Sequence, residues 1–135
     1  MITFGIPGPP QGKGRPKFGK GIVYTPIKTV SYESLIKVQA FNAMKGKNIY
    51  HCAVKVAMMI YMPVPGSWSK KKQTLALEHY LVPTVKPDLD NVVKVVFDAI
   101  NNIVWDDDKQ VAMLNVSKYY DKSPQIQITI MEIVT

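Results

Sequence analysis

The sequence is poor in the residues that form disulfides or zinc sites. It contains one cysteine, Cys52, and two histidines, His51 and His79, in 135 residues. A single cysteine excludes an intrachain disulfide, and so few thiol and imidazole groups make a zinc site of the Cys/His type implausible. Any metal ion that this chain binds must therefore be held mainly by oxygen.

Long hydrophobic segments are also absent. The longest apolar run, residues 56–62, ends at Pro63 and is far shorter than the roughly 20 residues that span a bilayer. Met1 is followed directly by a strand-like segment, residues 2–6, without the basic start and the small-residue cleavage site of a secretory signal. We therefore expect a cytoplasmic protein that has no membrane partner.

Acidic residues are scarce, because ten Asp and Glu stand against 17 Lys and Arg, which gives a net charge of +7. The excess lies in residues 1–60, whose net charge is +8, whereas residues 61–135 carry −1. Such a surface attracts polymers that bear phosphate, above all nucleic acids. Many small proteins of similar charge bind no polymer at all, so the charge alone does not decide the matter.

Composition and periodicity predict a single α+β domain over residues 1–135. Four segments show the pattern of strands: residues 2–6, 54–62, 111–119 and 126–130. Two segments show the pattern of helices, residues 28–44 and 89–100, and residues 67–78 could form a short third helix. This order predicts a mixed sheet of about four strands with two or three helices. In residues 89–100 the helical spacing predicts a stripe that faces the core: Leu89, Val92, Val93, Val96, Phe97 and Ile100.

Residues 7–21 contain nine Gly and Pro among fifteen residues, which predicts a loop. Four basic residues are interleaved with them: Lys13, Arg15, Lys17 and Lys20. Glycine lets a backbone approach a phosphate closely, so a DNA-binding loop is one interpretation and a solvated loop is the other. The glycine spacing matches neither a Walker A loop nor a dinucleotide fingerprint, so we expect no nucleotide cofactor.

Two further groups of residues each have two interpretations. Lys70, Lys71 and Lys72 follow Ser69 and could form either the start of a short helix or a solvated turn. Four aromatic residues could stack on unpaired bases, although packing within the protein is the commoner role of such side chains: Tyr24, Tyr32, Trp68 and Trp105.

Six of the ten acidic residues lie between positions 88 and 108: Asp88, Asp90, Asp98, Asp106, Asp107 and Asp108. Asp88 could simply cap the predicted helix, and Asp90 could form an ion pair with Lys94 one turn later. Neither role explains why a second group of aspartates follows the helix. If the chain turns back along the helix, Asp88, Asp90 and Asp108 form an all-oxygen site suited to Mg²⁺ or Mn²⁺.

Such a site predicts metal-assisted hydrolysis of a phosphodiester. The ion would generate hydroxide from bound water and would stabilise the charge that develops on the phosphate. Lys94 would stabilise the pentacovalent state or orient the water. A basic surface around an acidic site is the arrangement that an enzyme acting on nucleic acid needs.

The same residues resemble the RusA family of Holliday junction resolvases. The matching motifs are Lys86-Pro87-Asp88-Leu89-Asp90-Asn91, Lys94, Phe97-Asp98-Ala99, Trp105, Asp107-Asp108 and Gln110-Val111, together with an opening Ile6-Pro7-Gly8-Pro9-Pro10. The resemblance implies a catalytic set of Asp88, Asp90, Lys94 and Asp108, with the three aspartates as metal ligands and Asp107 in support. Some members have a basic residue where this chain has Pro87, and Lys86 could make that DNA contact instead.

The resemblance therefore implies a homodimeric, Mg²⁺-dependent endodeoxyribonuclease. It would resolve four-way DNA junctions by paired symmetric nicks during recombination and repair. A two-fold junction is best matched by a two-fold protein with two active sites. Two alternatives stay open: a nuclease for other branched DNA, and a non-catalytic DNA-binding module whose carboxylates hold a structural ion or cap a helix.

Overall fold

The predicted strands form one mixed sheet in the computed structural model of the chain, which describes residues 1–14, 17–19, 21–24 and 27–134. The strands are β1 (Ile2–Pro7), β4 (Val54–Pro63), β5 (Val111–Asp121) and β6 (Gln125–Glu132), in the spatial order β1-β6-β4-β5. β4 and β5 run parallel, and the other neighbours are antiparallel. The prediction of an α+β fold with a four-stranded mixed sheet is confirmed.

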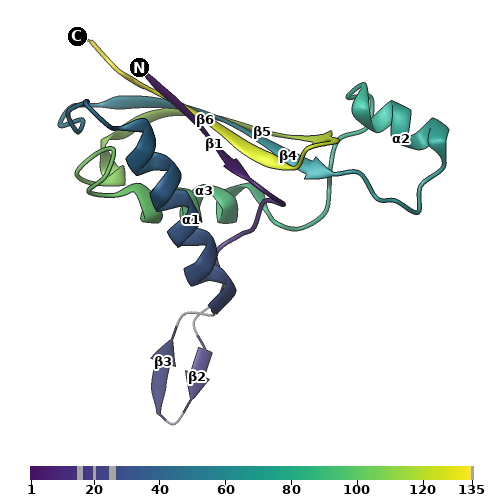
Figure 1. Cartoon of the computed structure of the whole chain (residues 1–135), viewed down its shortest axis with the longest axis horizontal. Helices are drawn as coiled ribbons and strands as arrows, with labels where there is room; N and C mark the ends of the chain where they lie inside the picture. Colours follow the sequence, from purple (N-terminus) through teal and green to yellow (C-terminus); the bar gives the residue numbers. More distant parts are fainter. Residues whose placement is uncertain (15–16, 20, 25–26, 135) are drawn as a thin grey trace.

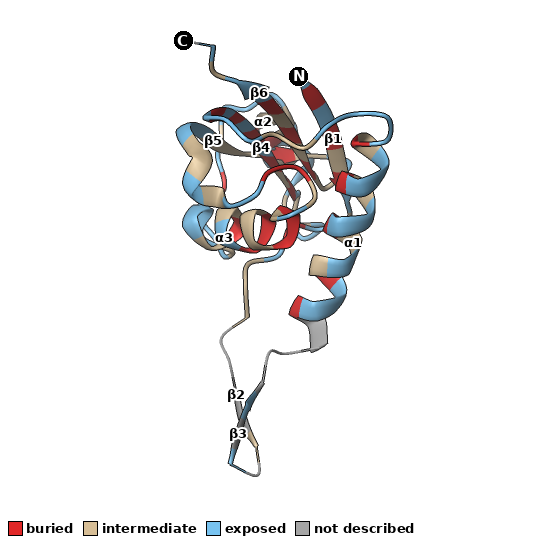
Figure 2. Ribbon diagram, turned by 90° about the vertical axis from the view of Figure 1, so that its left-hand side faces the viewer, coloured by how far each residue is buried: buried red, intermediate tan, exposed pale blue. Residues whose placement is uncertain are grey.

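Three helices accompany the sheet (Figure 1): α1 (Ile27–Ala43), α2 (Lys70–Leu77) and α3 (Leu89–Ile100). α1 and α3 cover one face of the sheet, whereas α2 projects beyond its end. Alternate residues of β4, from Val54 to Met62, are buried under the helices, as are Ile126, Ile128 and Ile130 of β6 (Figure 2). Among the described helices, none has both the length and the apolar composition needed to cross a membrane.

α3 has a strongly apolar face, but the face differs slightly from the predicted one. Val92, Val96 and Ile100 are fully buried, as expected. Leu89 was predicted to face the core and is instead 37% exposed, because the helix begins at this residue and its first turn lies at the edge of the domain. The buried face includes Val95 and Ala99, which the predicted stripe omitted.

The prediction that residues 7–21 form only a loop is wrong in part. β2 (Lys17–Gly19) pairs with β3 (Ile22–Tyr24) in an antiparallel hairpin that extends away from the domain (Figures 1 and 2). Gly21, with φ at 78°, gives the tight turn the left-handed conformation that glycine adopts readily. Strands of three residues are too short to produce a periodic signal. Arg15 and Lys20 lie outside the described residues, as do the side chains of Lys17 and Tyr24.

Packing accounts for three of the four aromatic residues considered above. Trp105 and Tyr32 are buried in the core. Trp68 is half-buried and meets the Tyr120 ring edge-on, with 5.3 Å between ring centroids. These contacts support the packing interpretation for Tyr32, Trp68 and Trp105.

Candidate active site

α3 carries the first group of aspartates, and its N-terminus exposes them. Asp88 is the N-cap residue, and its carbonyl oxygen accepts the first helical hydrogen bond from Val92 N at 3.1 Å. Its side chain, however, forms no capping hydrogen bond. The carboxylate is exposed at the start of the helix, so its expected structural role as a side-chain cap is not realised.

The chain just before Asp88 is held by a lysine from the sheet. Lys118 of β5 donates hydrogen bonds from Nζ to the carbonyl oxygens of Val85, at 2.6 Å, and Pro87, at 3.0 Å. A charged donor to a carbonyl is stronger than a neutral one. Lys118 therefore fixes the backbone from which Asp88 projects.

Asp90, Lys94 and Asp98 lie one helical turn apart along α3. Asp90 and Lys94 are both exposed, and among the described residues neither takes part in an ion pair within 4.0 Å. The i,i+4 ion pair that the sequence allowed is therefore not formed. The row extends about 12 Å along the helix at 1.5 Å per residue, with Lys94 in its middle.

The second group of aspartates follows α3 in a tightly held turn. Trp105 is fully buried, and its Nε1 donates to Asn101 Oδ1 at 2.6 Å, while its ring meets Phe97 edge-on. Gln110 Nε2 donates to the carbonyl oxygens of Tyr50 and Cys52, at 3.0 and 2.9 Å. These bonds attach residues 101–110 to the rest of the domain.

The three aspartates of this turn have different surroundings. Asp106 pairs with His51, with 2.7 Å between Oδ2 and Nδ1, and both side chains are exposed. Asp107 caps the short helix η1 (Asp108–Gln110) by accepting from Lys109 N. Asp107, which was predicted to support the site, thus has a structural role as a helix cap. Asp106 has a different partner from Asp108, because its carboxylate pairs with His51.

Asp108 is half-buried at the C-terminal end of α3. Burial raises its pKa above the ordinary value, and the nearby charges of Asp107 and Asp98 raise it further, while a hydrogen bond from the Asn101 side chain opposes them. A carboxylate with this surplus of negative charge is stabilised by a cation. A cation beside Asp108 would therefore offset the nearby charges of Asp98 and Asp107.

Lys13 from the N-terminal segment lies against α3, where its side chain is only partly exposed. Its Nζ contacts Asp98 Oδ2 at 2.5 Å and Glu33 Oε1 of α1 at 3.6 Å. The hydrogen bond to Asp98 raises the pKa of Lys13 above 10.5, and the charges of Asp98 and Glu33 contribute, while burial opposes them. The predicted contact of Lys13 with DNA stays a prediction, but the structure gives this ammonium two protein partners.

Close backbone packing brings the same segment to the start of α3. Lys13 N donates to Asn91 O at 3.3 Å, and Gly14 N donates to Thr29 Oγ1 at 2.8 Å. A Cβ atom at Gly12 would lie 2.7 Å from Asn91 Nδ2, which is closer than Cβ atoms approach non-bonded atoms in proteins. Only glycine allows this contact between the segment and the helix.

The two segments enclose an open pocket of about 390 Å³. Its lining residues are Gln11, Gly12, Lys86, Pro87, Asp88 and Asn91. Asp88 therefore faces a cavity with an exposed lysine, Lys86, on its wall. An anionic ligand near Asp88 would find a compensating cation here.

The predicted meeting of Asp88, Asp90 and Asp108 is not formed in the single chain. Within the described residues, no three Asp, Glu, His or Cys side chains are grouped closely enough to hold a metal ion. The reason is that Asp88 and Asp90 lie at the start of α3, whereas Asp108 is bonded to Asn101 beyond its end. Their roles as ligands stay predictions.

Sequence reasoning missed several residues that position the site. Lys118 and Glu33 act through contacts with residues distant in the chain, and Asn101 acts through Trp105 and Asp108 in the turn that follows it. Gln110 was quoted only as part of a motif, yet its side chain also accepts hydrogen bonds from Asp106 N and Asp107 N. A glutamine three residues after an aspartate at a helix start is a recognisable capping pattern, so this contact could have been found.

A row of two aspartates with a lysine between them, at the surface of a basic protein, suits the chemistry of an enzyme that cuts phosphodiesters. Comparison with known proteins agrees: residues 7–131 match the model of the family described as endodeoxyribonuclease RusA. The chain is also 36% identical over 138 residues to YqaN of Bacillus subtilis strain 168, described as uncharacterized, covering 98% of this chain and 96% of that protein. The chain belongs to the RusA endodeoxyribonuclease family, a family of Holliday junction resolvases.

Proposed function

We propose that this protein is a Mg²⁺-dependent endonuclease that resolves four-way DNA junctions, as a homodimer, by paired symmetric nicks in recombination and repair. The observation that carries the proposal concerns the carboxylates of Asp88 and Asp90, which are both exposed. The Asp88 side chain forms no capping hydrogen bond, and the Asp90 side chain forms no ion pair with Lys94. Carboxylates without a capping bond or an ion pair are available for a ligand. Membership of the family supports the same activity.

The donor chemistry suits a divalent cation that prefers oxygen. Mg²⁺ is commonly bound by one or two carboxylates, waters and phosphate oxygens of the substrate, so a preformed cage of three carboxylates is not required. Asp88, Asp90 and Asp108 would hold the ion in the homodimer assembled on DNA, and Mn²⁺ would suit the same oxygens. Once bound, the ion supplies hydroxide at neutral pH and stabilises charge on the phosphate.

Each side chain of the proposed catalytic set has a separate task. Asp88 and Asp90 attract the cation to the start of α3, and Asp108 adds negative charge from the turn that follows the helix. Lys94 projects between Asp90 and Asp98, where an ammonium stabilises the extra negative charge of a pentacovalent phosphate. Lys86, on the wall of the pocket beside Asp88, is suited to a neighbouring DNA phosphate.

The proposal is tested by cleavage of synthetic DNA with a matched pair of variants. Asp90→Asn and Asp108→Asn should each lower the rate of cutting by about 10³-fold or more, because each removes charge that binds and positions the cation. Asp106→Asn, in the same turn but paired with His51, should cut nearly as fast as the wild type. Junction binding by Asp90→Asn should persist or tighten, since a carboxylate near phosphate is removed.

The same assay separates the alternatives. Four-way, flap and linear DNA are compared with Mg²⁺, with Mn²⁺ and with a chelator. Preference for flaps would indicate a nuclease for other branched DNA, and binding without cutting under all conditions would indicate a DNA-binding module. An Asp106→Asn variant as inactive as Asp108→Asn would contradict the residue assignment.

A further inference from the structure

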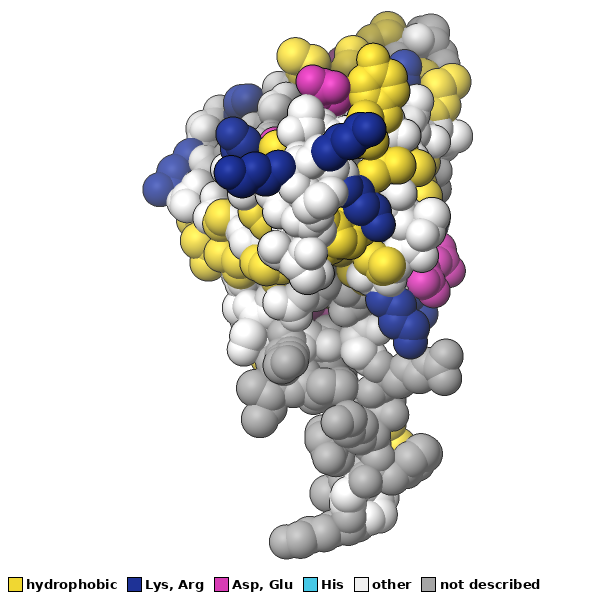
Figure 3. Space-filling view, turned by 90° about the vertical axis from the view of Figure 1, so that its right-hand side faces the viewer, with side chains coloured by type: hydrophobic (Ala, Val, Ile, Leu, Met, Phe, Trp, Pro, Cys, Tyr) yellow, Lys and Arg dark blue, Asp and Glu magenta, His cyan; other side chains and the backbone are white. Residues whose placement is uncertain are grey.

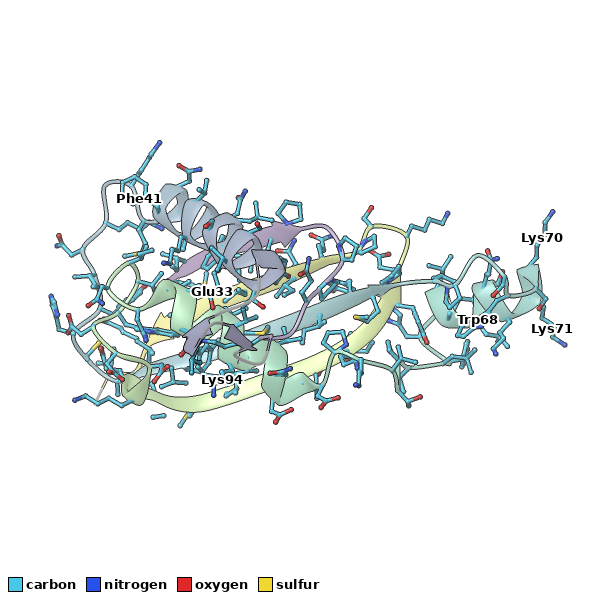
Figure 4. The ribbon with its side chains drawn as sticks, turned by 90° about the horizontal axis from the view of Figure 1, so that it is seen from below. Glu33, Phe41, Trp68, Lys70, Lys71 and Lys94 are labelled. Atoms are coloured by element: carbon cyan, nitrogen blue, oxygen red, sulfur yellow. The ribbon has the colours of Figure 1, made fainter. Side chains whose placement is uncertain are left out.

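The three lysines at the start of α2, Lys70, Lys71 and Lys72, form a basic surface that the proposed active site does not use; we call it the α2 lysine surface. α2 projects beyond the end of the sheet (Figure 1), and Lys70 and Lys71 lie at its tip, far from Glu33 and Phe41 (Figure 4). Figure 3, which views the molecule from the side of α2, shows Lys and Arg side chains gathered there. We propose that this surface binds the phosphate backbone of a DNA duplex arm outside the active site, an inference that deepens the proposed function.

The lysines occupy an unfavourable position for the stability of the helix. The N-terminus of a helix carries partial positive charge, which favours acidic residues, yet the first turn of α2 contains no acidic residue and three consecutive lysines. Among the described residues, no carboxylate lies within 4.0 Å of these ammonium groups. No ion pair among the described residues therefore offsets this concentration of charge, whereas a bound phosphate would compensate it.

The surface is held in place by the residues that precede the helix. Ser69 caps α2 by accepting a hydrogen bond from Lys72 N at 3.2 Å, and Gln73 Nε2 donates to Trp68 O at 2.8 Å. Trp68 packs edge-on against Tyr120 of β5. Because these contacts attach α2 to the sheet, the lysines are presented from a fixed base.

One of the lysines is also oriented by an aromatic ring. Lys72 Nζ lies 4.0 Å from the centroid of the Trp68 ring, a cation–π contact. Ordering the side chain before binding lowers the entropy that binding must overcome. An oriented ammonium beside two exposed ones suits a row of phosphates better than a small anion.

The position of α2 relative to the active site favours DNA as the partner. α3 begins on the side of the molecule that faces α2, while the β2–β3 hairpin extends from another side of the domain (Figure 1). Lys118 bonds the segment before Asp88 to β5, and Trp68 joins α2 to the same strand through Tyr120. A duplex whose cut phosphate lies at Asp88 can therefore continue towards the α2 lysine surface.

The test measures DNA binding in the presence of a chelator, so that the DNA is not cut during the measurement. The triple variant Lys70→Gln, Lys71→Gln, Lys72→Gln is compared with a control of equal charge, Lys37→Gln, Lys45→Gln, Lys55→Gln, whose exposed lysines lie on and after α1 and on β4. The α2 variant should bind a four-way junction on the order of tenfold more weakly at 100 mM salt. Its log–log salt slope should fall by about 2 to 3, since each lost phosphate contact removes about 0.9. The control should change both quantities much less.

Equal losses of junction affinity in the two triple variants would mean that only net charge matters, and this would overturn the inference. Salt slopes that are unchanged from the wild type in both variants would also overturn it. Circular dichroism checks that both variants are folded. Wild-type protein that binds through α2 but never cuts would refute the proposed function and leave the inference intact. If cutting depends on Asp90 but DNA binding is the same in the α2 variant and the wild type, the inference is refuted and the proposed function stands.

Discussion

Lys13 and the lysines of α2 come from short basic segments that look alike in the sequence, yet the fold gives them opposite surroundings. Lys13 Nζ lies between Asp98 and Glu33, and its backbone is bonded to α3. Lys70, Lys71 and Lys72 form the first turn of the projecting helix α2, and no described carboxylate pairs with them. Lys13 therefore takes part in the packing of the domain, while the lysines of α2 are available to a partner.

This difference shows that the number of lysines in a segment does not define a nucleic-acid surface. What matters is whether a carboxylate from another part of the chain neutralises them. Asp98 is 85 positions from Lys13, so the pair is invisible until the fold is known. A phosphate approaching Lys13 must compete with two carboxylates that are already in place.

The first test of this difference disrupts the contact between the N-terminal segment and α3. It has the largest expected effect on the free energy of unfolding. Gly12→Ala places a Cβ against Asn91, whose Nδ2, Cγ and Cβ atoms all lie within 3.2 Å of the new atom. We expect a loss of about 1 to 3 kcal/mol in the free energy of unfolding, the usual cost of overpacking. Urea denaturation measures it.

Gly66→Ala is the matched control for that variant. A Cβ at Gly66 meets no atom within 4 Å, and no positive φ is present there. Its free energy of unfolding should stay the same or rise slightly, because alanine restricts the unfolded chain. Equal destabilisation by the two substitutions would show that the contact between Gly12 and Asn91 is not specific.

The second test removes the ion pair itself through a double-mutant cycle. Lys13→Met should cost about 1 kcal/mol, since both partners are partly exposed and solvent weakens their attraction. Asp98→Asn in the Lys13→Met background should cost much less than in the wild type. The coupling energy is expected to be about 0.5 to 1 kcal/mol, and a value of zero would mean that the pair does not stabilise the fold.

The same pair predicts a dependence of stability on pH. The pKa of Lys13 is raised in the folded protein above 10.5, so its contribution is complete below that pH and is lost as the pH rises through the folded value. The free energies of unfolding of wild type and Lys13→Met should therefore converge as the pH rises above 10.5. A difference that persists unchanged after the Lys13 ammonium has been titrated would exclude the ion pair as its source.

Local patterns predicted much of the fold, because alternation and helical spacing depend on neighbouring residues alone. β4, β6 and α3 appear within one or two residues of their predicted bounds. The β2–β3 hairpin was missed because three-residue strands have no measurable period. The buried face of α3 was predicted incompletely, because the burial of Val95 and Ala99 depends on packing from α1 and the sheet.

The candidate site was predicted less fully than the fold. The sequence located the aspartates and Lys94, and the structure adds what surrounds them. The lysine contact at Pro87 and the ion pair at Asp98 join segments that only the tertiary fold brings together, while the hydrogen bond from Asn101 to Asp108 depends on the exact turn after α3. The metal-binding arrangement itself needs Asp88 and Asp90, at the start of α3, to act together with Asp108, beyond its end, and the fold of a single chain keeps these carboxylates apart.

The smallest expected effect concerns the α2 lysine surface and sharpens the comparison from the other side. Because lysines at the N-terminus of a helix oppose its dipole, Lys70→Gln with Lys71→Gln should leave the free energy of unfolding unchanged or raise it by a few tenths of a kcal/mol. Urea denaturation at low salt is the appropriate measurement, since salt screens the effect. A loss as large as that of Lys13→Met would mean that α2 has partners within the domain, and the two basic segments would then serve the same structural purpose.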